Sequence, residues 1–349
     1  MPWDVQFKKG VELPQIGWWL DGQKSADRAF VSHAHTDHCA RHREIVCTAA
    51  TAKLMRARMP GRRTEHLLPF GQTEQLTSDT TITLHPAGHI FGSAMCLIEH
   101  GEHGRLLYTG DFKLRPSLSA ELCTPPRADV LIMETTFGRP QYVFPPVEQV
   151  RAELVQFCQR TLADGATPVF FAYGLGKSQE LLCILGATDL PVMLHAETLR
   201  LTETCRQLGL ALPPCREFSA DELPGHVVIC PPQSQNSAFL RRIPARRTAM
   251  VSGWALDRAT IYRHRCDAAF PLSDHADFPE LLQLIELVQP KRVLTLHGFA
   301  ADFARCLRQR GIEAWAISEH NQLELPLSGP PAPRPLAPLQ HFDDTPFAT

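Results

Sequence analysis

Three histidines and an aspartate lie close together in the segment HAHTDH at residues 33–38. This segment directly follows the apolar run at residues 29–32, which we predict to be a strand. Several imidazoles and a carboxylate at one strand end are costly to place together unless a cation organises them. Both groups are ligands of zinc and similar divalent ions, and the spacing lets one pair bind one ion while the next pair binds a neighbour. The segment therefore predicts a metal site.

Two other segments each carry one residue of a ligand type. His89 follows a predicted strand and has Gly88 and Gly92 near it, which allow the backbone to approach closely. Asp111 follows another predicted strand and Gly110. Taken alone, neither signal is specific, because a single histidine is more often structural and an aspartate after a glycine is commonly a turn residue.

The elements that must position these residues differ between the two halves of the chain. Residues 1–135 alternate short β-rich runs with turns, with a helix predicted over 51–59 that Pro60-Gly61 ends. After a proline-bearing loop at 138–146, helices predicted over 147–163, 177–185 and 197–208 alternate with apolar strands. Strand-like runs return at 248–297 around a helix predicted over 279–288. This order indicates a sheet-rich α/β unit interrupted by a unit with a parallel sheet.

Composition limits the class of protein. The 349 residues suffice for two compact units or one large unit with an insertion, and 44% hydrophobic with 21% charged residues is typical of a soluble globular protein. We expect no membrane span and no secretory signal, and hence a cytoplasmic protein. The eleven cysteines are scattered without a C-x-x-C pair, so they predict reduced thiols rather than a disulfide framework or a zinc ribbon.

The net charge of −2 neither supports nor excludes nucleic acid as a partner. Two local basic runs could line a nucleic-acid site, or could equally be solvated faces. Their members are Lys53, Arg56, Arg58, Arg62 and Arg63 in the first run and Arg241, Arg242, Arg246 and Arg247 in the second.

The order of the three ligand-bearing segments, each at a predicted strand end, resembles the metallo-β-lactamase superfamily. Four later segments resemble the motifs of its β-CASP branch, whose members are nucleases acting on RNA or DNA. They are METTFG at 133–138, FAYGLGKSQE at 171–180, SDHAD at 273–277 and LHG at 296–298. Together these motifs cover most of residues 15–320.

The resemblance implies a four-layer αββα sandwich of α/β class with an inserted α/β cap domain. We expect residues 1–139 to form the first part of the metallo-β-lactamase domain, 140–250 the β-CASP cap and 251–326 the second part. The proline-rich end at 327–349 is predicted to be a disordered tail.

The resemblance also implies two adjacent divalent ions, with zinc favoured and manganese as the alternative. Two ions lower the pKa of a bridging water, orient the resulting hydroxide for in-line attack and offset charge on the phosphate. The implied ligands are His33, His35 and His89 for the first ion, Asp37, His38 and His297 for the second, and Asp111 bridging both. Asp37 and Asp111 count among the implied catalytic residues through this role.

Two further catalytic roles follow from the resemblance. His275 would protonate, or hydrogen-bond to, the departing oxygen, and Glu134 would orient its ring. Lys177 and Ser178 begin a predicted helix, and we expect that helix start to hold a substrate phosphate through its free N–H groups and the lysine charge. The segment lacks the G-x-x-x-x-G-K-[ST] spacing of a nucleotide-phosphate loop. The alternative to phosphate binding is a plain helix start with an exposed lysine.

The sequence leaves the substrate open between DNA and RNA. His297 is typical of RNA-processing members, whereas the overall size and the forms PAGHxFGSA and SDHADFPELL resemble bacterial exonucleases encoded beside an ATP-dependent DNA ligase. We favour a DNA repair exonuclease, with functional association with such a ligase, over an RNA-processing ribonuclease. Less favoured are a small-molecule hydrolase of the same fold and an inactive nucleic-acid-binding subunit. Polarity and exonuclease against endonuclease action stay open.

Overall fold

The computed structural model describes residues 2–257 and 259–317. The predicted tail at 327–349 and the predicted domain end at residue 326 lie outside these residues. The described residues form three sheets. Among their helices, none is long and apolar enough to cross a membrane.

The first and second sheets come from the two ends of the chain. The first sheet has the strand order β1 (Gln6–Phe7), β2 (Val11–Leu13), β3 (Trp18–Leu20), β4 (Arg28–Phe30), β5 (Glu44–Cys47), β6 (Thr64–Leu67). The second has the order β19 (Glu313–Ala316), β18 (Arg292–Leu296), β11 (Val130–Glu134), β10 (Gly104–Tyr108), β9 (Ala94–His100), β8 (Thr80–Pro86), β7 (Thr73–Thr77). The last two strands of the chain thus complete a sheet begun before residue 135.

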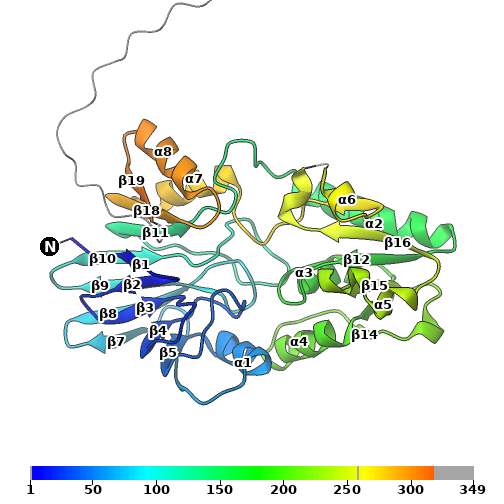
Figure 1. Ribbon diagram of the computed structural model, residues 1–349, viewed down its shortest axis with the longest axis horizontal. Helices are drawn as coiled ribbons and strands as arrows, with labels where there is room; N and C mark the ends of the chain where they lie inside the picture. Colours follow the sequence, from blue (N-terminus) through cyan, green and yellow to red (C-terminus); the bar gives the residue numbers. More distant parts are fainter. Residues whose placement is uncertain (1, 258, 318–349) are drawn as a thin grey trace, which may run out of the picture. The chain divides into compact units, whose positions relative to one another are not determined.

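These two sheets pack face to face and are covered by helices on their outer faces (Figure 1). One buried cluster joins Leu20 and Phe30 of the first sheet to Ile98 and Leu106 of the second. The outer face of the second sheet packs against α7 (Phe278–Val288) and α8 (Ala300–Gln309). The outer face of the first sheet packs against α1 (Ala49–Arg58). Alternating strand residues supply opposite faces, which is why each sheet has a core on both sides. This confirms the predicted αββα sandwich.

The strand directions gather several chain segments at one edge of the second sheet. β10, β11 and β18 are parallel, and β8 runs the same way because both β8 and β10 are antiparallel to β9. The carboxyl ends of these four strands therefore lie at the same edge. His89, Asp111, Glu134 and His297 lie at or just beyond those ends.

The third sheet consists of strands that lie between β11 and β18 in the sequence. Its strand order is β14 (Arg216–Glu217), β13 (Val192–Leu194), β15 (Val227–Cys230), β12 (Thr167–Phe171), β16 (Arg246–Val251), β17 (Ala268–Phe270), and all its pairs are parallel. Successive residues of β12 point to opposite faces: Phe170 joins the cluster with α2 and α3, and Phe171 joins the cluster on the other face. The predicted parallel sheet is present.

The five predicted helices, α1 to α4 and α7, agree with the sequence patterns to within two residues, whereas α5, α6 and α8 were not predicted. Around the third sheet lie α2 (Val147–Ala163), α3 (Lys177–Gly186), α4 (Ala196–Gln207), α5 (Ala238–Arg241) and α6 (Ala259–Arg263), with the 3-10 turns η1 (Ala220–Glu222), η2 (Pro232–Asn236) and η3 (Gly253–Leu256). The Asp277 side chain accepts from the Glu280 N–H and the Glu280 side chain from the Asp277 N–H, a capping box that starts α7. Strand β17 belongs to the third sheet, so that sheet continues past residue 250, where the sequence pattern suggested its end.

Candidate metal centre

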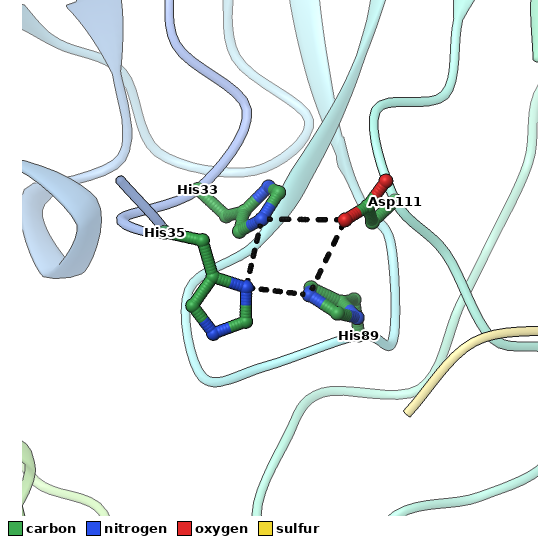
Figure 2. A group of neighbouring side chains, drawn as sticks. All are labelled: His33, His35, His89 and Asp111. Carbon is green, nitrogen blue, oxygen red and sulfur yellow. Dashed lines mark hydrogen bonds and ion pairs between the residues drawn. The ribbon is translucent and has the colours of Figure 1, made fainter. Parts of the chain in front are cut away.

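Four side chains from three separate segments meet at the shared strand edge. The ligand atoms of His33, His35, His89 and Asp111 lie within 4.8 Å of one another, as Figure 2 shows. The backbone N–H of Ala94 donates to the Ser32 carbonyl at 2.8 Å, which joins the segment after β4 to the start of β9. This contact brings the HAHTDH segment of the first sheet to the edge of the second.

Asp21 orients His33 through Ser32. This buried carboxylate accepts from the backbone N–H of Ser32 at 2.7 Å and from the Ser32 hydroxyl at 2.5 Å. Because the hydroxyl proton goes to Asp21, the Ser32 oxygen must accept from Nδ1 of His33, 2.9 Å away. His33 therefore carries its proton on Nδ1, and its Nε2 lone pair faces the cluster.

The hydrogen bonds of His35 and His89 assign their protons in the same way. His35 Nε2 lies 3.1 Å from the Leu175 carbonyl, and His89 Nδ1 lies 2.8 Å from the Asp274 carbonyl. A carbonyl oxygen only accepts, so each of these nitrogens carries the proton and the opposite nitrogen carries a lone pair. His35 Nδ1 lies 3.1 Å from both His33 Nε2 and His89 Nε2.

Burial keeps these rings neutral. It lowers the pKa of His33 well below its usual value, with help from His38 and His89, and lowers the pKa of His89 to about 3, with help from His275. Burial also lowers the pKa of His35. Three lone pairs that converge without a shared proton repel one another. A divalent cation relieves that repulsion, so the donor set fits a metal ion.

Asp111 completes this group. Its Oδ2 lies 3.6 Å from His33 Nε2, 3.7 Å from His89 Nε2 and 3.3 Å from His38 Nε2. Burial alone would raise the pKa of Asp111, but the charges of His38 and His275 hold it well below its usual range. The carboxylate is therefore ionised and lies between the first three histidines and His38, as a bridging ligand requires.

The residues implied for a second ion lie beside Asp111. His38 Nδ1 donates to Asp21 at 2.9 Å, which aims Nε2 at Asp111. The Asp37 carboxylate is exposed, 3.9 Å from His38 Nε2. His297 has a left-handed backbone with φ of 58°, and its ring centroid lies 5.7 Å from that of His38. These three side chains are more loosely gathered than the first group, and their assignment to a second ion stays a prediction.

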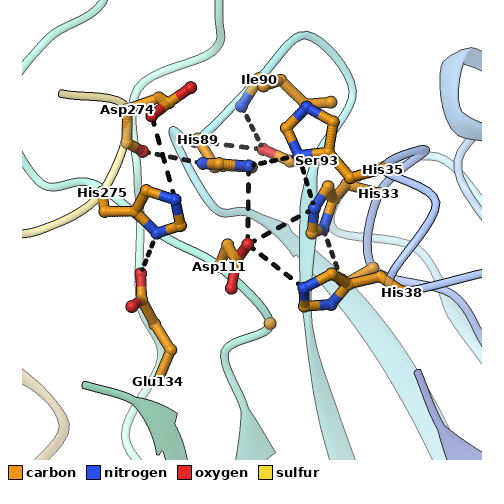
Figure 3. A network of polar contacts seen from close by, with 12 residues as sticks. His33, His35, His38, His89, Ile90, Ser93, Asp111, Glu134, Asp274 and His275 are labelled. Atoms are coloured by element: carbon orange, nitrogen blue, oxygen red, sulfur yellow. Dashed lines mark hydrogen bonds and ion pairs between the residues drawn. The ribbon is translucent and has the colours of Figure 1, made fainter. Parts of the chain in front are cut away.

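The predicted proton donor and its partner are in contact. His275 Nδ1 donates to Glu134 Oε1 at 2.9 Å, as Figure 3 shows. Glu134 is buried and also accepts from the backbone N–H groups of Phe112 and Thr136. Burial alone would lower the pKa of His275, but Glu134 and Asp111 outweigh it and raise the pKa to about 10. His275 is therefore protonated at neutral pH.

Lys177 and Ser178 begin α3, where we predicted contact with a substrate phosphate. Both side chains are buried; Lys177 Nζ is 2.7 Å from Asp274 Oδ1, and the Ser178 hydroxyl donates to the Tyr173 carbonyl at 2.8 Å. The backbone N–H groups of Ser178 and Gln179 already donate to the carbonyls of Tyr173 and Gly176. Backbone carbonyls before the helix thus accept from two of the N–H groups that were expected to be free. Because Lys177 also lines the cavity beside the candidate ligands, its contact with a substrate phosphate stays a prediction.

Asp274 is a site residue that the sequence did not single out. Its carbonyl orients His89, and its carboxylate pairs with Lys177 and lies 3.9 Å from His275 Nε2. Burial alone would raise the pKa of Asp274, but Lys177 and His89 hold it below the usual range. The adjacent His275 was the signal that could have found it, because a carboxylate next to a catalytic histidine commonly orients its surroundings.

Five of the seven candidate ligands line one cavity of about 450 Å³. His35, Asp37, His38, Asp111 and His297 line it from the sandwich. Its other described lining residues are Gln23, Thr36, Arg58, Thr136, Phe137, Tyr173, Lys177, Gln233, Ser252, Gly253, Trp254, Ser273, Asp274 and His275. Of the two basic runs, only Arg58 lines this cavity; Arg56 and Arg63 pair with Glu65.

Comparisons with known proteins agree with this geometry. The model of the Zn-dependent metallo-hydrolase RNA specificity domain matches residues 265–317. A protein of Opitutus terrae named Probable DNA ligase is 64% identical over 335 residues, which are 96% of this chain and 33% of that protein. The 5′ exonuclease Apollo of Rattus norvegicus is 28% identical over 316 residues, which are 82% of this chain and 54% of Apollo. The chain thus spans between a third and about half of the length of these relatives.

A solved structure shows the same fold. It is a protein of unknown function from Enterococcus faecalis V583, with a TM-score of 0.59 and 14% sequence identity, and the match covers 84% of this chain and 79% of that one. This likeness concerns the fold alone. Together with the αββα layers, the ligand-bearing strand ends and the matched domain, it confirms the resemblance seen in the sequence. The chain is therefore similar to the β-CASP branch of the metallo-β-lactamase superfamily in its motifs and in its fold.

Proposed function

We propose that this protein is a metal-dependent nuclease that hydrolyses phosphodiester bonds, and that it acts as a DNA exonuclease in repair or end processing. The observation that carries the proposal is the convergence of three neutral histidines on one ionised carboxylate, Asp111, beside a cavity that also contains His275. Metal ions bound there would supply an activated water and offset charge on a phosphate.

The protein residues have separate tasks in this account. Asp21, through Ser32 and His38, and Asp274, through His89, hold the ligand rings in the orientation that binding requires. His275 holds a proton, fixed on one side by Glu134, which it can donate to the departing oxygen. Asp111 stays ionised between the two groups of histidines.

DNA is favoured over RNA because of the relatives. One is named a DNA ligase and is about three times as long as the matched segment, and another is named a 5′ exonuclease. We infer that this chain works with an ATP-dependent DNA ligase, because it matches a third of a protein that is named Probable DNA ligase. RNA processing is the second candidate, and the observation in its favour is the RNA specificity domain at 265–317. For the metal, zinc is favoured over manganese by the name of that domain.

A substrate panel tests this proposal. The metal-reconstituted protein is incubated with end-labelled single-stranded DNA, double-stranded DNA and RNA of the same sequence, with zinc or manganese, and the products are separated on a gel. Asp37→Ala/His38→Ala removes implied ligands, and His66→Ala, a histidine that pairs with Glu44 away from the cluster, is the matched control. We expect the wild type and His66→Ala to shorten DNA and the double variant to leave it intact. RNA cleavage with intact DNA would favour the second candidate, and no metal-dependent cleavage would refute the nuclease.

A further inference from the structure

A second cavity adjoins the one that holds the candidate ligands. It also has a volume of about 450 Å³, and it shares His35, Arg58, Tyr173 and Gln233 with the first. Its remaining lining comes from the third-sheet part of the chain, including His195 at the start of α4. The shared residues place the two cavities side by side, with the first at the candidate metal centre, and we call the two together the groove.

Tyr173 stands where the two cavities meet. Its side chain is 58% exposed although it lines both of them. Its backbone is held in place, since its carbonyl accepts from the Ser178 N–H at 3.1 Å and from the Ser178 hydroxyl at 2.8 Å. Within residues 2–257 and 259–317 the Tyr173 hydroxyl has no hydrogen-bond partner. A single exposed tyrosine needs no explanation on an open surface, but this ring lies in the wall of a mainly polar cavity.

Trp254 is a second exposed aromatic residue in the wall of the first cavity. It is 44% exposed, and its ring packs against Phe137 at a centroid distance of 4.7 Å and against Tyr142 at 5.8 Å. Its backbone N–H donates to the Ser252 hydroxyl. Packing on one side and exposure on the other leave a rigid aromatic surface directed into the cavity.

Arg58 supplies the positive charge that lines both cavities. One of its guanidinium nitrogens donates to the Ala34 carbonyl at 2.7 Å, which holds the side chain next to the HAHTDH segment. No carboxylate lies within ion-pairing distance of it in the described residues, so its other N–H groups stay available for an anion. Exposed aromatic rings and a cation that line the same groove are features that bind an unpaired nucleic-acid strand.

We propose that Tyr173 and Trp254 stack on bases of a single nucleic-acid strand that lies in this groove, while Arg58 contacts its phosphate backbone. This inference rests on the proposed nuclease function and adds the strandedness of the substrate. In a duplex the faces of each base are covered by its neighbours, so only an unpaired or frayed strand can offer them to these rings. DNA and RNA share this chemistry.

The test measures binding apart from cleavage. Fluorescein-labelled single strands of DNA and of RNA are titrated with the full chain carrying Asp111→Asn to block hydrolysis, and binding is followed by anisotropy. Tyr173→Leu and Trp254→Leu should each weaken binding by about 5-fold to about 150-fold, the usual range for losing one stacked base. Tyr173→Phe keeps the ring and should bind as the parent does. Tyr262→Leu, which removes an 84% exposed tyrosine outside both cavities, is the control and should have no effect.

Abasic sites then identify the stacked positions. In the protein that keeps Tyr173, removing the base that stacks on this ring should weaken binding. In Tyr173→Leu, the same abasic site should cause no further loss of affinity. If both leucine variants bind as the parent does while the wild type cleaves the strand, the stacking inference is overturned and the proposed nuclease stands. Equal affinity for blunt duplex and for single strand also overturns it. If the wild type neither binds nor cleaves any nucleic acid, both proposals fail together.

Discussion

The Nε2 atom of His89 lies 3.1 Å from the Nδ1 atom of His35, and both atoms carry lone pairs. The other nitrogen of each ring donates to a backbone carbonyl, that of Asp274 and that of Leu175, and burial keeps both rings neutral. In a structural histidine network one of the two facing nitrogens would donate a proton to the other. This pair is instead arranged for a cation, and that distinguishes a metal centre from a satisfied core.

The metal-free protein should lose stability as the pH falls below about 6.5. Burial lowers the pKa of His89 to about 3 from the usual 6.5, so between these values the unfolded chain binds a proton that the folded chain does not. The free energy of unfolding should therefore fall by up to about 1.4 kcal/mol per pH unit from this residue. Urea unfolding in the presence of a chelator measures the free energy of unfolding at each pH. Its decrease with falling pH should be shallower for His89→Asn than for the wild type, and should be unchanged for His66→Ala. Identical slopes for all three would contradict the assigned neutral ring.

The metal-free protein should also lose stability as the pH rises above about 6.5. The pKa of His275 is raised to about 10, so the folded state keeps a proton that the unfolded chain has released. The stabilisation is complete below pH 6.5 and is lost as the pH approaches the folded value. His275→Asn should therefore flatten the decline in unfolding free energy between about pH 7 and about pH 8.5. A decline as steep as that of the wild type would mean that Glu134 does not stabilise the protonated form of His275.

A side chain at Gly88 should destabilise the protein more than a side chain at Gly71. Both have a left-handed backbone, with φ of 76° and 77°, but a Cβ at Gly88 would lie 2.3 Å from the Lys113 carbonyl and one at Gly71 would meet nothing within 4 Å. Gly71→Ala should cost about 1–2 kcal/mol of backbone strain alone. Gly88→Ala should cost roughly 1–3 kcal/mol more and should weaken zinc binding through the adjacent His89. Urea unfolding measures the stability of both variants, and zinc titration measures their affinity for zinc. Equal losses in the two variants would contradict the close contact between Gly88 and the Lys113 carbonyl.

The ion pair between Lys113 and Glu180 should support the folded state strongly. The two side chains are 2% exposed and lie 3.1 Å apart, joining the loop after Asp111 to α3. Lys113→Met leaves a buried carboxylate unpaired and should cost about 3–5 kcal/mol, while Lys113→Met/Glu180→Leu should recover much of that loss. Lys8→Met, which breaks a mostly exposed pair with Glu12, is the control and should cost less than about 1 kcal/mol. A similar small loss for Lys113→Met would show that the pair is dispensable.

The sequence predicted the candidate centre well because its residues follow strands. An apolar run ends, and a histidine or aspartate comes next; in a sheet whose strands share a direction, such residues meet at one edge. This logic covers His89 and Asp111, whereas Glu134 was implied only by the family resemblance. The five predicted helices also have local signals, such as Pro60-Gly61 after α1 and the capping box at Asp277 before α7, whereas α5, α6 and α8 were missed.

Contacts between distant segments could not be predicted in this way. The Lys177 charge was expected to face substrate, but it is buried against Asp274, and nothing local to FAYGLGKSQE indicates that partner. The third sheet also continues to Phe270, because β17 pairs with β16 beyond the loop that contains Trp254. Burial and strand pairing over long sequence separations depend on the whole fold, whereas turns and strand ends are encoded locally.

The central claim is that the cluster of His33, His35, His89 and Asp111 binds a divalent metal ion. Calorimetric titration of zinc into the metal-free full chain tests it most directly, with His89→Ala and Asp111→Asn as ligand variants and His66→Ala as the histidine control. The wild type and the control should bind zinc with the same affinity, and each ligand variant should bind at least about tenfold more weakly. Zinc binding of equal affinity in all four proteins, or none in the wild type, would contradict the account.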